Sequence, residues 1–356
     1  EPNISVSEIE AAIKKLKPRK APGLDGVCGE LIQCGGQTAM RSLHTICQRA
    51  WDQEKFPEVW TKSIIITIPK RGDLQLCENY QTITLIPHAS KILLEIIRRR
   101  LKPYIERNLS EGQAGFRPGR STVEQIFVWR QLAERYMEAQ NGELVNVFID
   151  FKKAFDRVWH TGMFKVMQHY NIPRKLTTLI QDLYSQAVSA VRVGCDISDW
   201  FHQSVGVRQG CILSPDLFNL FLEHVLGGAL EMYEGGALMN GQRVPDLRFA
   251  DDIDLMGETA SEAQDILVAV HQSSTKHGLE ISKEKTKVML VAKEHRDITI
   301  SLDNQMLGQV SHFKYLGTII TQQNNSLTDI RCRTAQALAA VNNLQVIWHN
   351  TYISLK

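Results

Sequence analysis

The spacing of apolar residues predicts a chain in which helices and strands are mixed. Apolar positions recur at helical intervals in some segments and form short, strand-length runs in others. The helical segments are 9–16, 92–101, 121–140, 174–187, 217–225, 260–277 and 327–344. The strand-like segments are 64–68, 144–149, 188–193, 200–205, 246–248, 253–255, 287–292 and 298–302. No repeat or low-complexity linker separates them, so the pattern predicts an α-rich mixed chain.

Two helix starts carry capping signals. Ser7 and Glu10 have the spacing of a capping box for the first helix. Ser214 is expected to cap a later helix, because serine is a favoured N-cap residue and Pro215 suits the first helical position. Asp216 then places negative charge in the first turn, where the helix dipole favours it.

The segment 249–252 has the sequence Phe-Ala-Asp-Asp and lies between two short strand-like runs. Its acids are therefore predicted to lie at the turn of a hairpin. Adjacent carboxylates repel each other and contribute nothing to a core. A cation between Asp251 and Asp252 would offset this repulsion, and oxygen ligands favour a hard ion such as Mg2+. The alternative is a solvated turn.

A third acid, Asp150, ends the apolar run at 144–149 and precedes a turn into a helix. The end of a buried strand before a helix is a common place for a functional site. Two metal ions about 4 Å apart need carboxylates from separate strands. Asp150 and Asp251, with Asp252 as the auxiliary acid, would supply them. A strand-end cap or an ion-pair partner is the alternative role for Asp150.

A glycine-containing segment lies between these acids in the sequence. Gly206 and Gly210 allow a close backbone approach, and Gln209 has an amide that could donate to a base, sugar or phosphate. An ordinary glycine turn before a helix is the alternative.

Three motifs in a fixed order carry a family resemblance. They are Phe-Ile-Asp-Phe-Lys-Lys-Ala-Phe-Asp at 148–156, Gly-Val-Arg-Gln-Gly-Cys-Ile-Leu-Ser-Pro at 206–215 and Phe-Ala-Asp-Asp at 249–252. Together they resemble the successive palm motifs of reverse transcriptases of non-LTR (LINE-type) retrotransposons. Further segments that resemble this family are 17–26, 60–73, 79–85, 113–122, 278–287 and 313–317, so the resemblance covers essentially the whole chain.

The resemblance implies a right-hand polymerase of the α+β class, with fingers, an antiparallel palm sheet and a partial thumb. The expected parts are an N-terminal extension (1–60), fingers (61–143), a palm with the primer grip (144–320) and the start of a truncated thumb (321–356). Because the chain starts at Glu1 rather than methionine, it looks like a fragment.

The resemblance also implies roles for individual residues. Asp150, Asp251 and Asp252 match the catalytic, metal-binding acids, and Phe155 matches an aromatic gate against a ribose 2′-hydroxyl. The nucleotide-binding residues would be Phe155, Gln209, Gly210, Lys70 and Lys285, and the primer or template residues Arg117, Arg120, Tyr315, Leu316 and Gly317. Lys285 matches a general acid toward pyrophosphate. A core aromatic remains the alternative for Phe155, and a solvated lysine the alternative for Lys285.

The implied activity is RNA-directed DNA polymerisation, by two-metal nucleotidyl transfer to a primer 3′-hydroxyl. The implied cofactor is a pair of Mg2+ ions, with Mn2+ as a substitute. The implied partners are an RNA template, a DNA primer, deoxynucleoside triphosphates and an endonuclease domain in the full-length protein. A group II intron or other prokaryotic reverse transcriptase is the alternative within the same class, but the opening at 20–26 and the spacing at 79–80 favour the LINE type.

Four positions depart from the family pattern. Gln81 stands where an arginine usually holds the triphosphate, and a neutral amide cannot offer a charged, bidentate fork to phosphate. Thr82, Phe249 and Ser282 also replace the usual residues. The acids are intact, so the metal site should form. The rival function is a nucleic-acid-binding remnant of a mobile element with weakened or lost catalysis.

The net charge of the chain limits where it could bind nucleic acid. The net charge is only +2, so positive charge for nucleic acid must be local. It clusters in two runs, Lys14, Lys15, Lys17, Arg19 and Lys20, and Arg98, Arg99, Arg100 and Lys102. A solvated helix face is the alternative for either run.

The seven scattered cysteines include no Cys-x-x-Cys pair, which disfavours disulfides and zinc and favours a reducing compartment. No apolar run reaches membrane-spanning length and no signal-peptide pattern is present. We therefore expect a nuclear or cytoplasmic ribonucleoprotein that is neither secreted nor membrane-bound.

Overall fold

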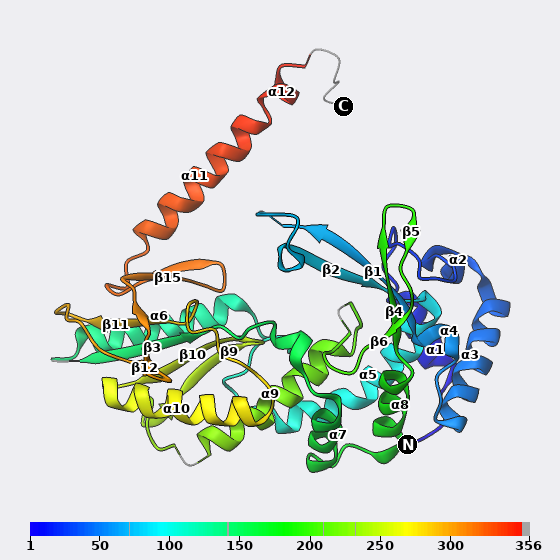
Figure 1. The fold of residues 1–356 in the computed structure, drawn as a ribbon, viewed down its shortest axis with the longest axis horizontal. Helices are drawn as coiled ribbons and strands as arrows, with labels where there is room; N and C mark the ends of the chain where they lie inside the picture. The colour runs from blue at the N-terminus through cyan, green and yellow to red at the C-terminus, as the bar shows by residue number, and fades with distance from the viewer. Residues whose placement is uncertain (71, 141, 209, 232, 351–356) are drawn as a thin grey trace. The chain divides into compact units, whose positions relative to one another are not determined.

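The computed structural model describes residues 1–350 except 71, 141, 209 and 232, and it divides into two compact units (Figure 1). Unit 1 consists of Glu1–Glu111, Phe151–Ala229 and Gln272–Glu280. Unit 2 consists of Gly112–Asp150, Leu230–His271 and Ile281–Lys356. Each unit is thus assembled from three segments that are separate in the sequence.

Unit 1 contains a five-stranded sheet with the order β2-β1-β4-β5, in which β6 also pairs with β4. The strands are β1 (Lys62–Pro69), β2 (Tyr80–Leu85), β4 (Val188–Val193), β5 (Asp196–Ile197) and β6 (Phe201–His202). β1 runs antiparallel to β2 and parallel to β4. The buried hydroxyls of Ser63 and Ser189 lie 2.9 Å apart between β1 and β4. The predicted strand pair at 188–193 and 200–205 is confirmed, although β6 is shorter than expected.

The core of unit 1 is organised around α5 (His88–Asn108). Apolar side chains on this helix with no solvent exposure are Ile92, Leu93, Leu94, Ile96, Ile97, Leu101 and Ile105. The other helices are α1 (Val6–Lys14), α2 (Gly29–Cys34), α3 (Gly36–Gln53), α4 (Glu58–Thr61), α7 (His160–His169), α8 (Arg174–Ser185) and α9 (Ser214–Leu230), with 3-10 turns η1 (Cys77–Asn79) and η2 (Ala154–Arg157).

Both predicted capping arrangements are wrong in detail. The capping box of α1 is formed by Ser5 and Glu8 rather than by Ser7 and Glu10. Ser214 is the first residue of α9, and its hydroxyl donates a hydrogen bond of 2.7 Å to the carbonyl of Arg208. This hydroxyl therefore ties the helix to the preceding loop.

The basic run at 98–102 is neither a free nucleic-acid surface nor a solvated face. Arg98 and Lys102 pair with the buried Asp216 of α9 at 2.8 and 2.9 Å. Arg100 pairs with Glu8 of α1 at 2.9 Å, and only 9% of its side chain is exposed. These charges hold α1 and α9 against α5, because a buried carboxylate must be paired.

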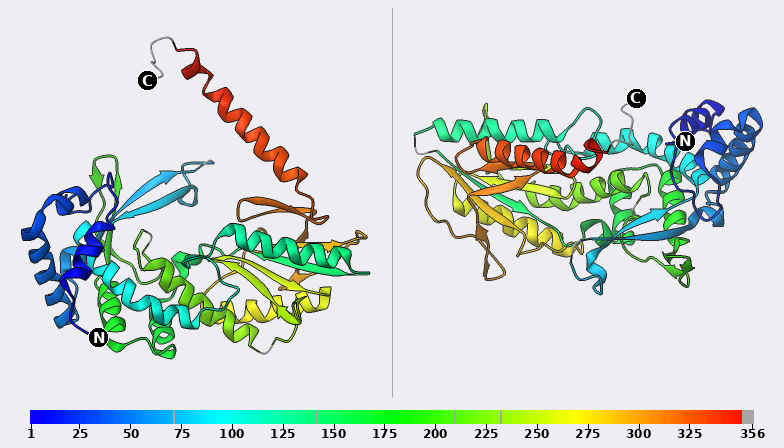
Figure 2. Two further views of the ribbon diagram at one scale, coloured as in Figure 1. Left: turned by 180° about the vertical axis from the view of Figure 1, so that it is seen from behind. Right: turned by 90° about the horizontal axis from the view of Figure 1, so that it is seen from above.

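Unit 2 contains a five-stranded sheet with the order β14-β11-β3-β10-β9. The strands are β3 (Glu143–Ile149), β9 (Asp246–Phe249), β10 (Asp252–Gly257), β11 (Lys287–Ala292) and β14 (Gly308–Gln309). All neighbours are antiparallel except β11 and β14. α6 (Thr122–Glu138) lies on one face, and α10 (Ala260–Lys276) runs along the other, as Figures 1 and 2 show.

The core between α6 and this sheet consists of Trp129, Leu132, Ala133, Tyr136, Leu144, Phe148, Ala237, Leu247, Met256, Met289, Val291, Tyr315 and Ile320. Alternate residues of β3 contribute to it, as the period of a strand requires. Unit 2 also has three two-stranded hairpins: β7 (Ala237–Met239) with β8 (Gln242–Val244), β12 (Ser301–Leu302) with β13 (Gln305–Met306), and β15 (His312–Tyr315) with β16 (Thr318–Thr321). The strand predicted at 298–302 is confirmed only at its end.

The C-terminal part of unit 2 is α11 (Leu327–Asn343) followed by α12 (Gln345–Trp348). The predicted helix at 327–344 is confirmed, and α11 has no buried residue. Within the described residues, no helix combines the length and the apolar character that crossing a membrane would require.

Candidate active site

The acids of the 249–252 segment lie at a tight hairpin in unit 2, as the sequence predicts. Phe249 at the end of β9 pairs with Asp252 at the start of β10, so Ala250 and Asp251 form the turn. Ala250 has a φ of +61°, a left-handed conformation that costs energy for a residue with a Cβ. The hairpin therefore presents two consecutive carboxylates at one end of the sheet.

The pairing of β3 with β10 brings the third acid to the same end. Ile149 pairs with Ile253, so Asp150 follows one strand at the level where Asp252 begins the other. Residues opposite each other on antiparallel strands have Cα atoms about 5 Å apart. Two acids that are distant in the sequence thus become neighbours through backbone hydrogen bonding.

The pKa values of Asp251 and Asp252 are both raised. Burial and then the charge of Asp150 raise the pKa of Asp251 above its usual value. Burial, followed by the charges of Asp251 and Asp150, raises the pKa of Asp252 to about 6. The three negative charges are therefore held together against their mutual repulsion.

The backbone of Asp150 is fixed by the turn at 282–286. Its carbonyl accepts a hydrogen bond of 2.7 Å from the N–H of Ser282, and its own N–H donates to the hydroxyl of the buried Thr286 at 3.3 Å. The same turn carries Lys285, whose ammonium lies 3.8 Å from a carboxylate oxygen of Asp150. The Lys285 side chain is 72% exposed, so it remains free to reorient.

Gln113 holds the hairpin turn, and sequence reasoning gave it no role of its own. Its side-chain oxygen accepts hydrogen bonds from the N–H groups of Ala250 and Gly115 at 2.9 and 2.7 Å. Its backbone bridges to Arg248 of β9, and only 1% of Gln113 is exposed. A Cβ at Gly115 would collide with the backbone nitrogen of Ala250, so only glycine allows this approach.

The remaining residues of unit 2 that were predicted to contact primer or template lie in a loop and in a hairpin turn. Arg117 donates to the carbonyl of Gln113 at 3.0 Å, and the N–H of Arg120 donates to the carbonyl of Arg117 at 3.4 Å. Leu316 and Gly317 form the turn of the β15–β16 hairpin with φ values of +47° and +83°.

Tyr315, at the end of β15, has a buried side chain. Its ring lies 5.8 Å from that of Phe148, and its hydroxyl donates to the carbonyl of Leu247 at 3.4 Å. Burial first, and then nearby aspartates, raise the pKa of Tyr315 well above its usual value. The Tyr315 side chain therefore anchors the hairpin in the core; in the turn, Leu316 is half-buried against this core and Gly317 is exposed.

Phe155, Lys70 and the glycine motif belong to unit 1. Phe155 is stacked on Phe218 with ring centroids 4.0 Å apart. Its carbonyl accepts from the N–H of Val207 at 2.8 Å, so the segment at 206–207 packs against η2. Gly210 has a φ of +86°, and Gln209 lies outside the described residues. Lys70 is exposed directly after β1, and its N–H donates to the carbonyl of Asn79 at 2.7 Å.

Residues 68–320 match the model of the reverse transcriptase (RNA-dependent DNA polymerase) family. This match covers more than half of the chain. The chain belongs to the reverse transcriptase family.

Relatives from mobile elements agree with this assignment. The uncharacterized 149 kDa protein of transposon TX1 from Xenopus laevis is 27% identical over 90% of this chain and 24% of its own length. The probable RNA-directed DNA polymerase from transposon BS of Drosophila melanogaster is 29% identical over 90% of this chain and 36% of its own length. The Pol polyprotein of the type-1 element R2 from Popillia japonica is 27% identical over 88% of this chain and 44% of its own length. The resemblance to non-LTR reverse transcriptases is confirmed, and this chain spans less than half of these relatives.

A solved structure shows the same fold. Apo telomerase from Candida tropicalis, truncated from its C-terminal domain, aligns with a TM-score of 0.54 over 74% of this chain and 54% of that one. The sequence identity is 13%, so the likeness concerns the fold alone. The predicted α+β right-hand polymerase fold is confirmed.

The carboxylates of this reverse transcriptase chain fit a divalent cation that is shared with substrate. Among the residues that the structure describes, no three His, Cys, Asp or Glu side chains form a group that could hold a metal ion. Mg2+ is usually bound by one or two carboxylates together with substrate phosphates and water. Burial and then the charges of Asp251 and Asp150 raise the pKa of Asp252, and a cation would offset these charges. Reverse transcriptases use divalent metal ions.

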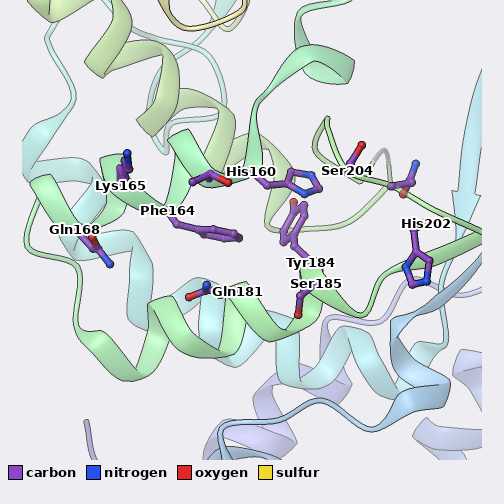
Figure 3. A pocket seen from close by; sticks show the side chains of 11 residues that line it. His160, Phe164, Lys165, Gln168, Gln181, Tyr184, Ser185, His202 and Ser204 are labelled. Atoms are coloured by element: carbon purple, nitrogen blue, oxygen red, sulfur yellow. The ribbon is translucent and has the colours of Figure 1, made fainter.

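A cavity in unit 1 contains none of the predicted site residues. It has a volume of about 570 Å³ and lies beside α7 and α8 and the segment at 202–204. Figure 3 shows the rings of His160, Phe164 and Tyr184 along this cavity. His160 contacts the carbonyl of Gly206 at 2.8 Å, so the cavity wall supports the glycine motif.

Replacing Gln113 tests its role in holding the acid turn. Gln113→Ala leaves the buried N–H groups of Ala250 and Gly115 without their partner, and each lost bond costs about 1–3 kcal/mol. We expect urea titration to show a lower free energy of unfolding. Gln140→Ala, at an exposed glutamine of the same unit, is the control and should change little. Equal stability of the two variants would show that the turn forms without Gln113.

Proposed function

We propose that this chain is the polymerase part of a non-LTR retrotransposon protein and performs RNA-templated DNA synthesis. The observation that carries the proposal is the coupled set Asp150, Asp251 and Asp252 at one sheet end, in a chain of the reverse transcriptase family. The substrates would be deoxynucleoside triphosphates and a DNA primer on an RNA template. The cofactor would be two Mg2+ ions, with Mn2+ as a substitute.

In this proposal Asp150 and Asp251 hold the ions and Asp252 assists. When bound, the ions would activate the primer 3′-hydroxyl and neutralise charge on the leaving pyrophosphate. Lys285 is the general acid toward pyrophosphate, since its exposed ammonium already lies 3.8 Å from Asp150. The turn at 282–286 keeps the backbone of Asp150 fixed while the lysine side chain moves.

The other proposed roles concern nucleotide and strand contacts. Phe155, Gln209, Gly210 and Lys70 bind the nucleotide, with Phe155 as the gate against ribose. Arg117 and Arg120 contact the template, and the turn at Leu316 and Gly317 contacts the primer. Phosphate contacts of this kind give binding that depends on salt and little on sequence.

The length of the relatives bears on which other domains the full-length protein carries. Because these relatives extend well beyond the matched region, we propose that the full-length protein also carries an endonuclease domain. The boundaries at 60, 143 and 320 between extension, fingers, palm and thumb belong to the same proposal. The site of action would be a nuclear or cytoplasmic ribonucleoprotein.

Primer extension on an RNA template with purified protein and Mg2+ tests the function directly. Asp150→Asn removes a negative charge where the ions bind, an interaction worth several kcal/mol, so the rate should fall about a thousandfold. RNA affinity and thermal stability should be nearly unchanged. Asp297→Asn, at an exposed aspartate of unit 2, is the matched control. Extension by Asp150→Asn at the unaltered rate would rule out this acid as a metal ligand.

Substitution of Phe155 tests sugar selection. Phe155→Val shortens the side chain, so ribonucleotides should be incorporated about tenfold better relative to deoxyribonucleotides. Competitive incorporation assays measure this ratio. Phe164→Val, at a half-buried ring on α7, controls for general loss of aromatic packing. If the two variants discriminate equally well, Phe155 is only the packing partner of Phe218.

Gln81 supports the second candidate function, a binding remnant with weak catalysis. This neutral side chain is exposed on β2, opposite Ile68 of β1. Gln81→Arg would add a charged donor to phosphate, so the KM for nucleotide should fall about tenfold or more. The effect on RNA affinity should be smaller.

Ile83→Arg is the control for Gln81→Arg. It adds the same charge two residues further along the same exposed face of β2. Equal KM values for Gln81→Arg and the unaltered chain would show that another cation, such as Lys70, already holds the triphosphate. If neither extends a primer, the binding remnant becomes the better description.

A further inference from the structure

A second cavity in unit 1 is lined by several lysines beside a buried histidine. Lys15, Lys17, Lys20, Lys91 and His88 line a volume of about 290 Å³. The first three lie at the end of α1 and in the loop that follows it, and the other two lie in the first turn of α5. The N-terminal lysine cluster therefore faces a defined concavity and is more than a solvated helix face.

The charge of the lysines in this cavity is only partly balanced by carboxylates, among them Asp25, whose charge acts on Lys91 and His88. Glu95 is its one lining carboxylate among the described residues, and its oxygens are already bound by Lys15 at 2.5 Å and by Arg99 at 2.8 Å. Within the described part of the chain, Lys17, Lys20 and Lys91 form no ion pair. The cavity thus has an excess of positive charge that an anion would offset.

One lining group, the His88 ring, is withdrawn from water, and burial followed by the charge of Lys91 lowers its pKa. His88 is 1% exposed, and its Nε2 atom has no hydrogen-bond partner among the described residues. Its Nδ1 atom lies 3.5 Å from the ammonium of Lys91. Burial lowers the pKa of Lys91, the charge of Asp25 partly opposes this shift, and the charge of Lys20 adds to it. The amino end of α5 adds the positive end of a helix dipole.

Close backbone packing builds the cavity from distant segments. A Cβ at Gly23 would lie 2.5 Å from the nitrogen of Pro87, so glycine lets the lysine-bearing loop rest against the start of α5. Gly210 lines the cavity from the third segment, and a Cβ there would lie 2.8 Å from the carbonyl oxygen of Thr84. The backbone segments that carry these lysines are therefore held in place by close packing.

We propose that this cavity binds a backbone phosphate of a single-stranded nucleic acid. The proposal rests on the proposed function and deepens it by naming where a strand is held within unit 1. The cavity is at the lower limit of ligand pockets, which span about 300–1,000 Å³, so it suits one phosphate with its sugar rather than a whole nucleoside triphosphate. Ammonium groups bind such a phosphate as point charges without selecting a base.

The test measures affinity for a fluorescein-labelled single-stranded RNA, without metal ion or nucleotide, at several salt concentrations. Lys20→Gln with Lys91→Gln should weaken binding about tenfold. The slope of log K against log salt should become shallower by about 0.7, because the cavity is proposed to neutralise one phosphate of the strand. The effect should be the same for two unrelated sequences.

Lys14→Gln is the matched control, because this lysine belongs to the same basic cluster but is 74% exposed and paired with Glu10. Its slope should equal that of the unaltered chain. Lys91→Arg keeps the charge and should keep most of the affinity. Lys20→Gln alone, at an exposed side chain, should give half of the slope change without affecting thermal stability.

Two outcomes would overturn the proposal. An unaltered salt slope in the double variant would show that no phosphate contact is lost. Unaltered RNA binding with a raised KM for deoxynucleoside triphosphate would assign the cavity to the nucleotide instead. Asp150→Asn, which should slow extension about a thousandfold without affecting RNA binding, separates failure of this proposal from failure of the proposed polymerase function.

Discussion

The antiparallel pairing of β3 with β10 is the constraint on which the candidate site depends. It fixes Ile149 opposite Ile253 and so places Asp150 beside Asp252, although the carboxylates repel each other. The apolar residues that follow and precede these acids are buried in the sheet, so the backbone cannot relax to separate the charges. The free energy of the core thus keeps these negative charges close together.

The turn that carries the acids is held by close packing of a neighbouring backbone segment and not by ion pairs. Ala250 adopts a left-handed conformation, and the buried Gln113 holds its N–H from the neighbouring segment. Gly115 makes this possible, because any Cβ would collide with the turn. Strain and precise placement of this kind are maintained only where the surroundings over-determine the backbone. The stability of unit 2 and the placement of its carboxylates are therefore coupled.

The basic residues divide into two groups with different physical roles. In the basic run on α5, Arg98 forms an ion pair with Asp216 and Arg100 forms one with Glu8. These pairs orient helices within unit 1. The lysines around the cavity at the start of α5 have no such carboxylate partners within the described residues, apart from Lys15. With a net charge of only +2, a nucleic-acid-binding protein must keep some cations unpaired at chosen places. The pairing pattern, rather than the number of cations, marks where an anion can bind.

The sequence by itself determined the elements, the acid hairpin and the family, because periodicity, turn residues and ordered motifs are local properties of the chain. It predicted that Asp150 and Asp251 would belong to one site, since the motifs that carry them resemble a known palm. Only the tertiary structure decided that Ser5 rather than Ser7 caps α1, that Arg98 and Lys102 serve Asp216, and that Gln113 holds the acid turn. The latter two join residues more than a hundred positions apart. Such partners are chosen by packing, and residue spacing along the chain does not encode them.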